Sequence, residues 1–130
     1  MQTIPNSSQF RLGLAGINVM HYRRQSQRLD LVQSPRSGIS AHPRKDRAHE
    51  FRFIDYSAGD RLLLTTDGLT DQVGGEGRLR SFGYSRTKAI LESSLNREVT
   101  EVADELIRAM DSWRGVNERR DDVTVICIDL

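Results

Sequence analysis

Cysteine is nearly absent from this sequence, since Cys127 is the only one. A single cysteine excludes a disulfide within the chain, and its place in an apolar stretch favours a buried thiol over a nucleophile. Long hydrophobic runs are also lacking, and no stretch approaches the length of a membrane span. The first twenty residues contain the polar segment 5–9 and Arg11 where a secretory signal would be continuously apolar. We therefore expect a cytoplasmic protein with no membrane association.

Neither basic nor acidic residues are in large excess, and the net charge is +1. However, the basic and acidic residues are unevenly distributed along the chain. Residues 23–52 hold eight basic side chains against three acidic ones, whereas residues 97–130 hold five basic against nine acidic. The basic segment could bind nucleic acid or a phosphorylated partner. It has no interleaved aromatic residues and no nucleic-acid-binding motif, so we favour a solvated surface and consider nucleic acid an improbable partner.

The chain of 130 residues is long enough for one domain and one core. We expect a disordered N-terminus over residues 1–9, followed by an α+β fold with a mostly antiparallel sheet covered by helices. The patterns predict strands at 10–15, 19–23, 29–31, 50–55, 61–66 and 123–129, and helices at 85–95 and 99–113. The first two strands are expected to form a hairpin, and the strand at 50–55 to continue into 61–66 as a meander. The helices would cover one face of the sheet and leave the other uncovered.

Most of the chemistry is concentrated between residues 57 and 77. The apolar run 61–66 predicts a strand buried on both faces, and Asp67-Gly68 ends it abruptly. Gly68 would allow a backbone turn that leaves the Asp67 carboxylate at the end of the strand. The glycines at 74, 75 and 77 would then form a loop flexible enough to surround something held there. Taken alone, Asp67 is more typical of a turn former or a cap than of a ligand.

The end of the chain mirrors this arrangement, because Asp121-Asp122 precedes the apolar strand 123–129. If the two strands are antiparallel neighbours, Asp67 meets Asp121 or Asp122 at one edge of the sheet. Two carboxylates about 4 Å apart repel by roughly 4 kcal/mol at an effective dielectric constant of about 20, so such a pair needs a proton or a cation. Oxygen ligands without His or Cys favour Mg²⁺ or Mn²⁺.

Three motifs in order resemble the PPM family of metal-dependent protein serine/threonine phosphatases, in its bacterial SpoIIE-type branch. They are the run 59–72 around Thr66-Asp67-Gly68, the Phe-Gly-Tyr-Ser-Arg run at 82–86, and Asp-Asp-Val-Thr-Val-Ile at 121–126. In this family the Asp of Thr-Asp-Gly and the first Asp of the terminal acidic pair bind one metal of a two-metal centre. The resemblance thus implies that Asp67 and Asp121 are metal ligands and catalytic, with Mn²⁺ or Mg²⁺ as the cofactor.

The same resemblance implies a supporting part for Asp122, a loop role for Gly68, and an outer-ligand or loop role for Asp71. The family's first acidic motif, an Asp followed by Gly-His-Gly or a close variant, has no counterpart in the sequence. We therefore expect residues 10–130 to be the C-terminal portion of such a domain. The corresponding fold is a partial version of the family's αββα sandwich.

The implied function is metal-dependent hydrolysis of phosphoserine or phosphothreonine on a regulatory protein. Substrates in this branch are commonly phosphorylated anti-sigma-factor antagonists, so a partner of that type and a role in signalling are expected. With one acidic motif missing, we expect the chain alone to be a poor phosphatase or none. The alternative is a catalytically incomplete remnant that acts as a binding or dimerisation module, assembling through the uncovered sheet face.

Overall fold

The computed structural model describes residues 2–3, 8–14, 16–34 and 51–130. Its strands are β1 (Gln2–Thr3), β2 (Gln9–Gly13), β3 (Asn18–Arg23), β4 (Arg28–Val32), β5 (Phe51–Asp55), β6 (Arg61–Thr65), β7 (Val73–Gly74), β8 (Arg80–Ser81) and β9 (Val125–Asp129). Its helices are α1 (Asp67–Thr70), α2 (Gly83–Ser93) and α3 (Val99–Arg114). Where disorder was expected over residues 1–9, the structure places Gln2–Thr3 and Gln9 in paired strands.

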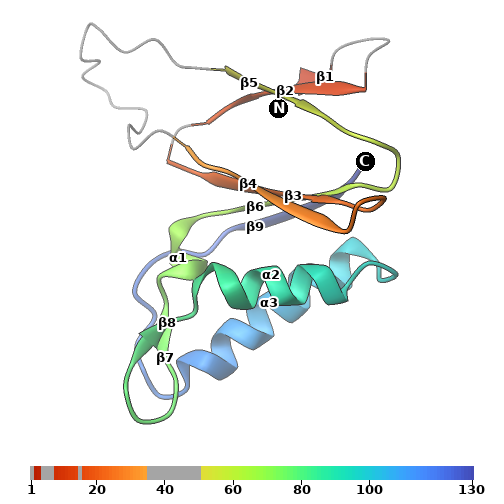
Figure 1. Cartoon of the computed structure of the whole chain (residues 1–130). Helices are drawn as coiled ribbons and strands as arrows, with labels where there is room; N and C mark the ends of the chain where they lie inside the picture. Colours follow the sequence, from red (N-terminus) through yellow and green to blue (C-terminus); the bar gives the residue numbers. More distant parts are fainter. Residues whose placement is uncertain (1, 4–7, 15, 35–50) are drawn as a thin grey trace, which may run out of the picture.

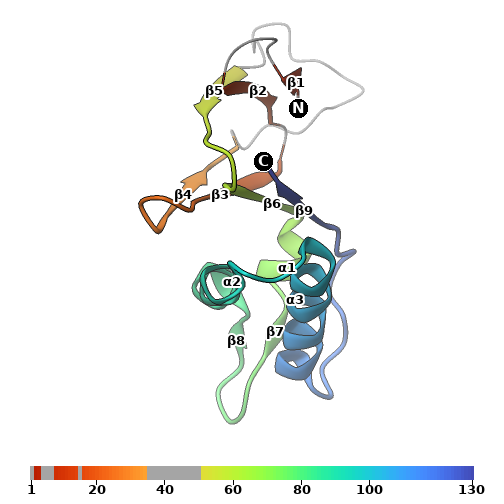
Figure 2. The same cartoon turned by 90° about the vertical axis from the view of Figure 1, so that its right-hand side faces the viewer.

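These elements form three layers, which Figures 1 and 2 show from two sides. The outer sheet has the strand order β1-β2-β5, and the central sheet has the order β4-β3-β6-β9. Every neighbouring pair in both sheets is antiparallel. The helices pack on the other face of the central sheet, which confirms the predicted α+β class.

Strand β6 lies in the middle of the molecule because its side chains are apolar on both faces. Leu62 packs with Phe10 and Ile54 of the outer sheet, whereas Leu63 packs with Leu91 and Leu106 of the helices. Leu62 and Leu63 are fully buried. The prediction of a strand with two buried faces is therefore confirmed, and the strand joins the two halves of the core.

The two long helices follow the predicted apolar pattern closely. In α3 the buried residues Val102, Leu106 and Met110 recur at four-residue steps and face the sheet. The helix ends before Gly115, whose φ of 57° is the left-handed conformation that glycine adopts most easily. Helix α2 begins at Gly83, two residues before the predicted cap at Ser85. None of the helices in the described part of the chain is both long and apolar enough to cross a membrane.

Two predicted strand connections are wrong. Strand β2 pairs with β1 and β5, and β3 pairs with β4 and β6, so β2 and β3 belong to different sheets and form no hairpin. Likewise, β5 and β6 form no meander, because the turn at 56–60 crosses from the outer sheet to the central one. Burial explains both differences. Strand β5 buries Ile54 and exposes Phe51 and Phe53, which suits an outer layer, whereas β3 and β6 are buried on both faces.

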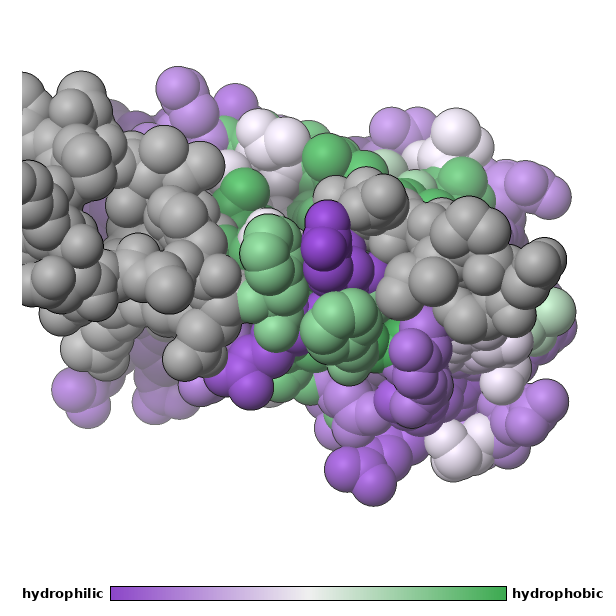
Figure 3. Space-filling view, turned by 90° about the horizontal axis from the view of Figure 1, so that it is seen from above, coloured by the Kyte–Doolittle hydropathy of each residue, from purple (hydrophilic) through white to green (hydrophobic). Residues whose placement is uncertain are grey.

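The predicted uncovered face of the central sheet is also wrong, because the outer sheet covers it. The exposed face is instead the far side of the outer sheet, where Phe51 and Phe53 are 53% and 62% exposed. Figure 3 shows this side, on which hydrophobic and hydrophilic side chains are interspersed. The Arg11 guanidinium lies 4.4 Å from the centre of the Phe51 ring. A cation over an aromatic face shields part of that apolar surface.

A buried carboxylate fixes the turn that connects the two sheets. The Asp60 carboxylate is only 2% exposed and accepts three hydrogen bonds of 3.0 Å, from the backbone N–H groups of Ser57 and Arg24 and from Nε2 of His21. His21 is completely buried and packs edge-on against Phe10. Its other ring nitrogen, Nδ1, has no hydrogen-bond partner in the described part of the chain. The imidazole is therefore a packing residue between the layers.

A buried arginine joins the start of β6 to the end of β9 and to the α2–α3 connection. Arg61 donates to both oxygens of Asp129, at 2.6 and 3.1 Å. It also donates to the carbonyl oxygens of Ser94 and Arg97, at 2.8 and 2.7 Å. Burial opposes the charged form, but the hydrogen bond to Asp129 is the larger effect and raises the pKa of Arg61. Arg61 thus connects the central sheet with the helical layer at the end opposite Asp67.

We expect Arg61→Leu to lower the free energy of unfolding by roughly 2–4 kcal/mol, because two buried carbonyl groups lose their donors. Urea unfolding of the chain followed by circular dichroism would measure the change. Arg108→Leu, at an exposed position of α3, is the matched control and should be close to neutral. Equal effects of the two substitutions would contradict the structural role given to Arg61.

We expect the chain to lose stability as the pH falls through the ordinary His pKa of 6.5. Burial lowers the pKa of His21, against the opposing hydrogen bond to Asp60, so the unfolded chain takes up a proton that the folded chain does not. Above that pH this contribution is constant, and below it stability declines. Urea unfolding between about pH 7.5 and about pH 5.5 would show the decline, and His21→Gln should make it shallower. Identical slopes for both proteins would contradict the role assigned to His21.

Candidate metal site

The candidate site begins where β6 ends. Thr66 has an extended backbone with φ −70° and ψ 160°, and α1 then starts at Asp67. Leu69 points into a core cluster with Phe82 and Met110, so the short helix is fixed by its apolar side. Gly68, Leu69 and Thr70 are consequently buried, whereas Asp67 remains exposed. The local sequence therefore presents this carboxylate at the surface, as predicted.

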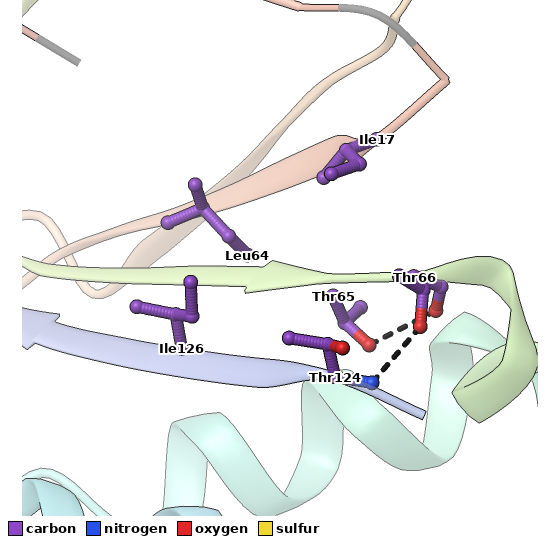
Figure 4. Close-up of a pocket in the computed structure, with 6 residues that line it drawn as sticks. All are labelled: Ile17, Leu64, Thr65, Thr66, Thr124 and Ile126. Carbon is purple, nitrogen blue, oxygen red and sulfur yellow. Dashed lines mark hydrogen bonds between the residues drawn. The ribbon is translucent and has the colours of Figure 1, made fainter. Parts of the chain in front are cut away.

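Strands β6 and β9 are antiparallel neighbours, which confirms the pairing on which the predicted site depends. Their register places Thr65 opposite Val125, and the pairing continues one residue further, with Thr66 N–H donating to the Thr124 carbonyl at 3.2 Å. Figure 4 shows Thr66 and Thr124 side by side next to a small, mainly apolar hollow lined also by Ile17 and Ile126. The backbone segments that carry Asp67 and the terminal acidic pair thus meet at this end of the sheet.

Gly68 is required for close packing and not for an unusual backbone angle. It lies in α1 and is not among the glycines with positive φ, which differs from the turn that we predicted there. A Cβ atom at this position would lie 2.3 Å from the carbonyl oxygen of Asp122. Only a residue without a side chain allows α1 to approach the Asp122 backbone so closely.

Thr66 and Gln72 hold the segment 118–124 against α1. The Thr66 hydroxyl donates to the Asp122 carbonyl at 3.1 Å and accepts from the Thr124 N–H at 3.0 Å. The Gln72 side chain is fully buried, with Nε2 donating to the Glu118 carbonyl at 3.0 Å and Oε1 accepting from the Arg120 N–H at 3.3 Å. Our sequence reasoning missed Gln72. No pattern in the sequence signals that it is buried, because a glutamine after a short helix is normally solvated.

The two segments carry four exposed carboxylates: Asp67, Asp71, Asp121 and Asp122. Among the residues that the structure describes, none donates a hydrogen bond to the side chain of Asp67, Asp71 or Asp122. Asp121 Oδ1 accepts from the backbone N–H of Asp122 at 2.7 Å, which orients its carboxylate. The neighbouring Arg119 instead donates to Asp111 at 3.3 Å. The negative charge at this edge is therefore available to a cation.

The donor atoms suit a hard divalent cation in type but not in number. Carboxylate oxygens are the ligands that Mg²⁺ and Mn²⁺ prefer. However, the described ranges contain no group of three or more His, Cys, Asp or Glu side chains that could hold a metal ion. Asp67 and Asp121 stay candidate ligands, Asp122 a candidate supporting residue, and Asp71 a candidate outer ligand or loop residue.

The glycine-rich stretch after α1 does not surround this site, as we had expected it to. It forms the β7–β8 hairpin, which packs on the C-terminal end of α3. The Gly75 N–H donates to the Trp113 carbonyl at 2.9 Å, and a Cβ atom on Gly74 would lie 1.9 Å from that same oxygen. Arg86 stacks on the Trp113 ring at 3.6 Å, and the indole N–H donates to the Arg80 carbonyl. Gly74 and Gly75 therefore provide close packing, whereas a Cβ atom on Gly77 would meet nothing within 4 Å.

The chain matches one family model and is similar in fold to phosphatase domains of known structure. The family model described as "Stage II sporulation protein E (SpoIIE)" matches residues 1–130. The SiaA-PP2C domain of Pseudomonas aeruginosa is similar in structure, with a TM-score of 0.78 and 22% identity over 95% of this chain and 47% of that one. Comparison with curated protein sequences finds no match.

Two structures of SpoIIE from Bacillus subtilis are also similar. One contains the PP2C phosphatase domain with a fragment of the regulatory domain, with a TM-score of 0.69 and 18% identity over 94% of this chain and 33% of that one. The other is the phosphatase domain presoaked with Mn, with a TM-score of 0.61 and 18% identity over 95% of this chain and 56% of that one. The chain thus spans between a third and just over half of the length of these structures.

We expect Gly68→Ala to lower the free energy of unfolding by about 1–3 kcal/mol, because the new methyl group overlaps the Asp122 carbonyl. A loss of stability would be informative, because replacing glycine by alanine within a helix normally stabilises it by about 1 kcal/mol. Gly13→Ala is the control, because its methyl group would lie 3.3 Å from the movable Phe51 ring. Urea unfolding and the amide chemical shifts of residues 121–124 would report the effect. A gain in stability would contradict the close contact.

Proposed function

The chain belongs to the family of stage II sporulation protein E (SpoIIE), and we propose that it forms part of a metal-dependent protein phosphatase. Its reaction would be the hydrolysis of phosphoserine or phosphothreonine on a regulatory protein. The observation that carries this proposal is the meeting of the Asp67 and Asp121 segments at one end of the β6–β9 pair. The exposure of these carboxylates, with no cationic side chain bound to them in the described residues, supports it further.

Asp67 and Asp121 would hold a divalent ion, Mn²⁺ or Mg²⁺. Asp71 would be an outer ligand or loop residue, and Asp122 would support the ligands without binding the ion. When bound, such an ion supplies an activated water and neutralises charge on the phosphate. The chain itself would contribute two anionic oxygen donors at one end of the β6–β9 pair. The Asp122 N–H orients the Asp121 carboxylate through a hydrogen bond. Because two carboxylates make a weak site, a further ligand has to come from residues beyond those described.

The substrate is proposed from the family alone. Phosphorylated anti-sigma-factor antagonists are the usual substrates of this branch, so a small phosphorylated regulatory protein is the partner that we propose. A cellular location in the cytoplasm agrees with such a substrate.

A second candidate function is a binding module without catalysis. The exposed side chains of Phe51 and Phe53 on the outer sheet favour it, because exposed aromatic residues commonly mark contact surfaces. This module would assemble through the far side of the outer sheet, and not through the central sheet, whose second face is covered.

We expect Asp67→Asn to weaken Mn²⁺ binding to the chain at least tenfold, because a neutral amide replaces a charged ligand. Asp104→Asn, at an exposed position of α3, removes the same charge away from the site and should have no effect. Paramagnetic broadening of the amide signals of residues 67 and 121 on titration with Mn²⁺ would measure binding.

In the same samples, release of phosphate from a phosphoserine peptide should be slow in the unmodified chain and slower still in Asp67→Asn. Rapid turnover by the chain would contradict the need for a further ligand. Equal Mn²⁺ binding by the two Asp→Asn variants would reject the metal site and leave the binding module as the remaining candidate.

A further inference from the structure

We infer that Thr66 and Gln72 are positioning residues, which fix the backbone on both sides of Asp121 relative to Asp67. The inference rests on the proposed function, because it concerns the same two carboxylates. Thr66 directly precedes Asp67, and Gln72 follows the end of α1, so the two residues enclose the element that carries Asp67. Both contact the segment 118–124, which carries Asp121.

Thr66 anchors the backbone after Asp121, at the two peptides on either side of Val123. Its hydroxyl has one proton, which it donates to the Asp122 carbonyl at 3.1 Å, and it accepts from the Thr124 N–H at 3.0 Å. The second of these bonds is visible in Figure 4. With the backbone bond from Thr66 N–H to the Thr124 carbonyl, three hydrogen bonds join Thr66 to this segment.

Gln72 anchors the backbone before Asp121, at the two peptides on either side of Arg119. Its amide donates to the carbonyl groups of Val73 and Glu118, at 3.1 and 3.0 Å, and its oxygen accepts from the Arg120 N–H at 3.3 Å. Gln72 is 0% exposed, so each of these polar atoms depends on a protein partner. A buried glutamine with its donors and its acceptor all used on nearby backbone groups gives rigidity where regular structure is missing.

The segment 118–124 has no helix or strand of its own and is largely exposed. Without side-chain bonds it would have to be ordered when a cation binds, and that ordering would weaken binding. The two anchors hold the Arg120 N–H before Asp121 and the Asp122 carbonyl after it, and the bond from the Asp122 N–H to Asp121 Oδ1 orients the carboxylate between them. Neither Thr66 nor Gln72 carries charge, so any effect on a cation acts through the position of the carboxylates.

The test compares Thr66→Val, which removes the hydroxyl at nearly constant volume, with Thr66→Ser, which retains it. Thr100→Val, at an exposed position of α3, is the control for the same chemical change elsewhere. Gln72→Met removes the amide and keeps the length. Mn²⁺ affinity would be measured from the broadening of the amide signals of residues 67 and 121, and stability from urea unfolding of the same samples.

We expect Thr66→Val and Gln72→Met to weaken Mn²⁺ binding roughly tenfold, as is usual for residues that orient metal ligands. Thr66→Ser and Thr100→Val should bind Mn²⁺ like the unmodified chain. Rescue by serine is the decisive result, because serine restores only the two hydrogen bonds. If Gln72→Met does not fold, the Thr66 pair still tests the inference.

Three outcomes would overturn it. Unchanged Mn²⁺ affinity in Thr66→Val, with Asp67→Asn still weakened, would reject positioning and leave the proposed function intact. Reduced stability with unchanged Mn²⁺ affinity would give Thr66 a structural role only. Equal Mn²⁺ binding by the unmodified chain and Asp67→Asn would reject the proposed function, and the positioning role would fall with it.

Discussion

The antiparallel pairing of β6 with β9 is the constraint on which the rest of this structure depends. It joins residue 65 to residue 125 across 60 positions of sequence and brings together two acidic segments that are otherwise unrelated. Polar contacts secure both ends of the pair. Arg61 binds Asp129 and the α2–α3 connection at one end, and Thr66 binds the 118–124 segment at the other. A shift of register by one residue would reverse the faces of β9 and separate these contacts.

The three-layer arrangement follows from how many faces each strand can bury. Strands β3 and β6 are apolar on both sides and occupy the central sheet, whereas β5 buries one side only and lies in the outer sheet. One crossing between the two sheets is the turn at 56–60, which the buried Asp60 carboxylate fixes. The helices close the opposite face through Leu91, Val102 and Leu106. The candidate site lies at the edge of this core, and its carboxylates face solvent.

Two glycines allow close backbone contacts, one next to Asp67 and one at the C-terminal end of α3. Gly68 touches the Asp122 carbonyl, and Gly74 touches the Trp113 carbonyl, at distances that no Cβ atom would tolerate. In both cases glycine lets a helix and a connecting segment approach more closely than side chains would permit. Part of the stretch that the composition suggested to be a mobile loop, at Gly74 and Gly75, is therefore packed on the C-terminal end of α3.

The sequence by itself determined the local elements and the identity of the acidic residues. The apolar periodicity of α3, the doubly buried strand β6 and the acidic pair before β9 are all evident from residue patterns, because each depends on neighbours a few positions away. The pairing of β6 with β9 could also be anticipated from their mirrored patterns. Only the tertiary structure decided which sheet holds β2 and β5, what covers the second face of the central sheet, and that Gln72 and Thr66 hold the 118–124 segment. Those features depend on contacts between residues tens of positions apart, and the sequence pattern of a single strand or loop does not specify its partner across the core.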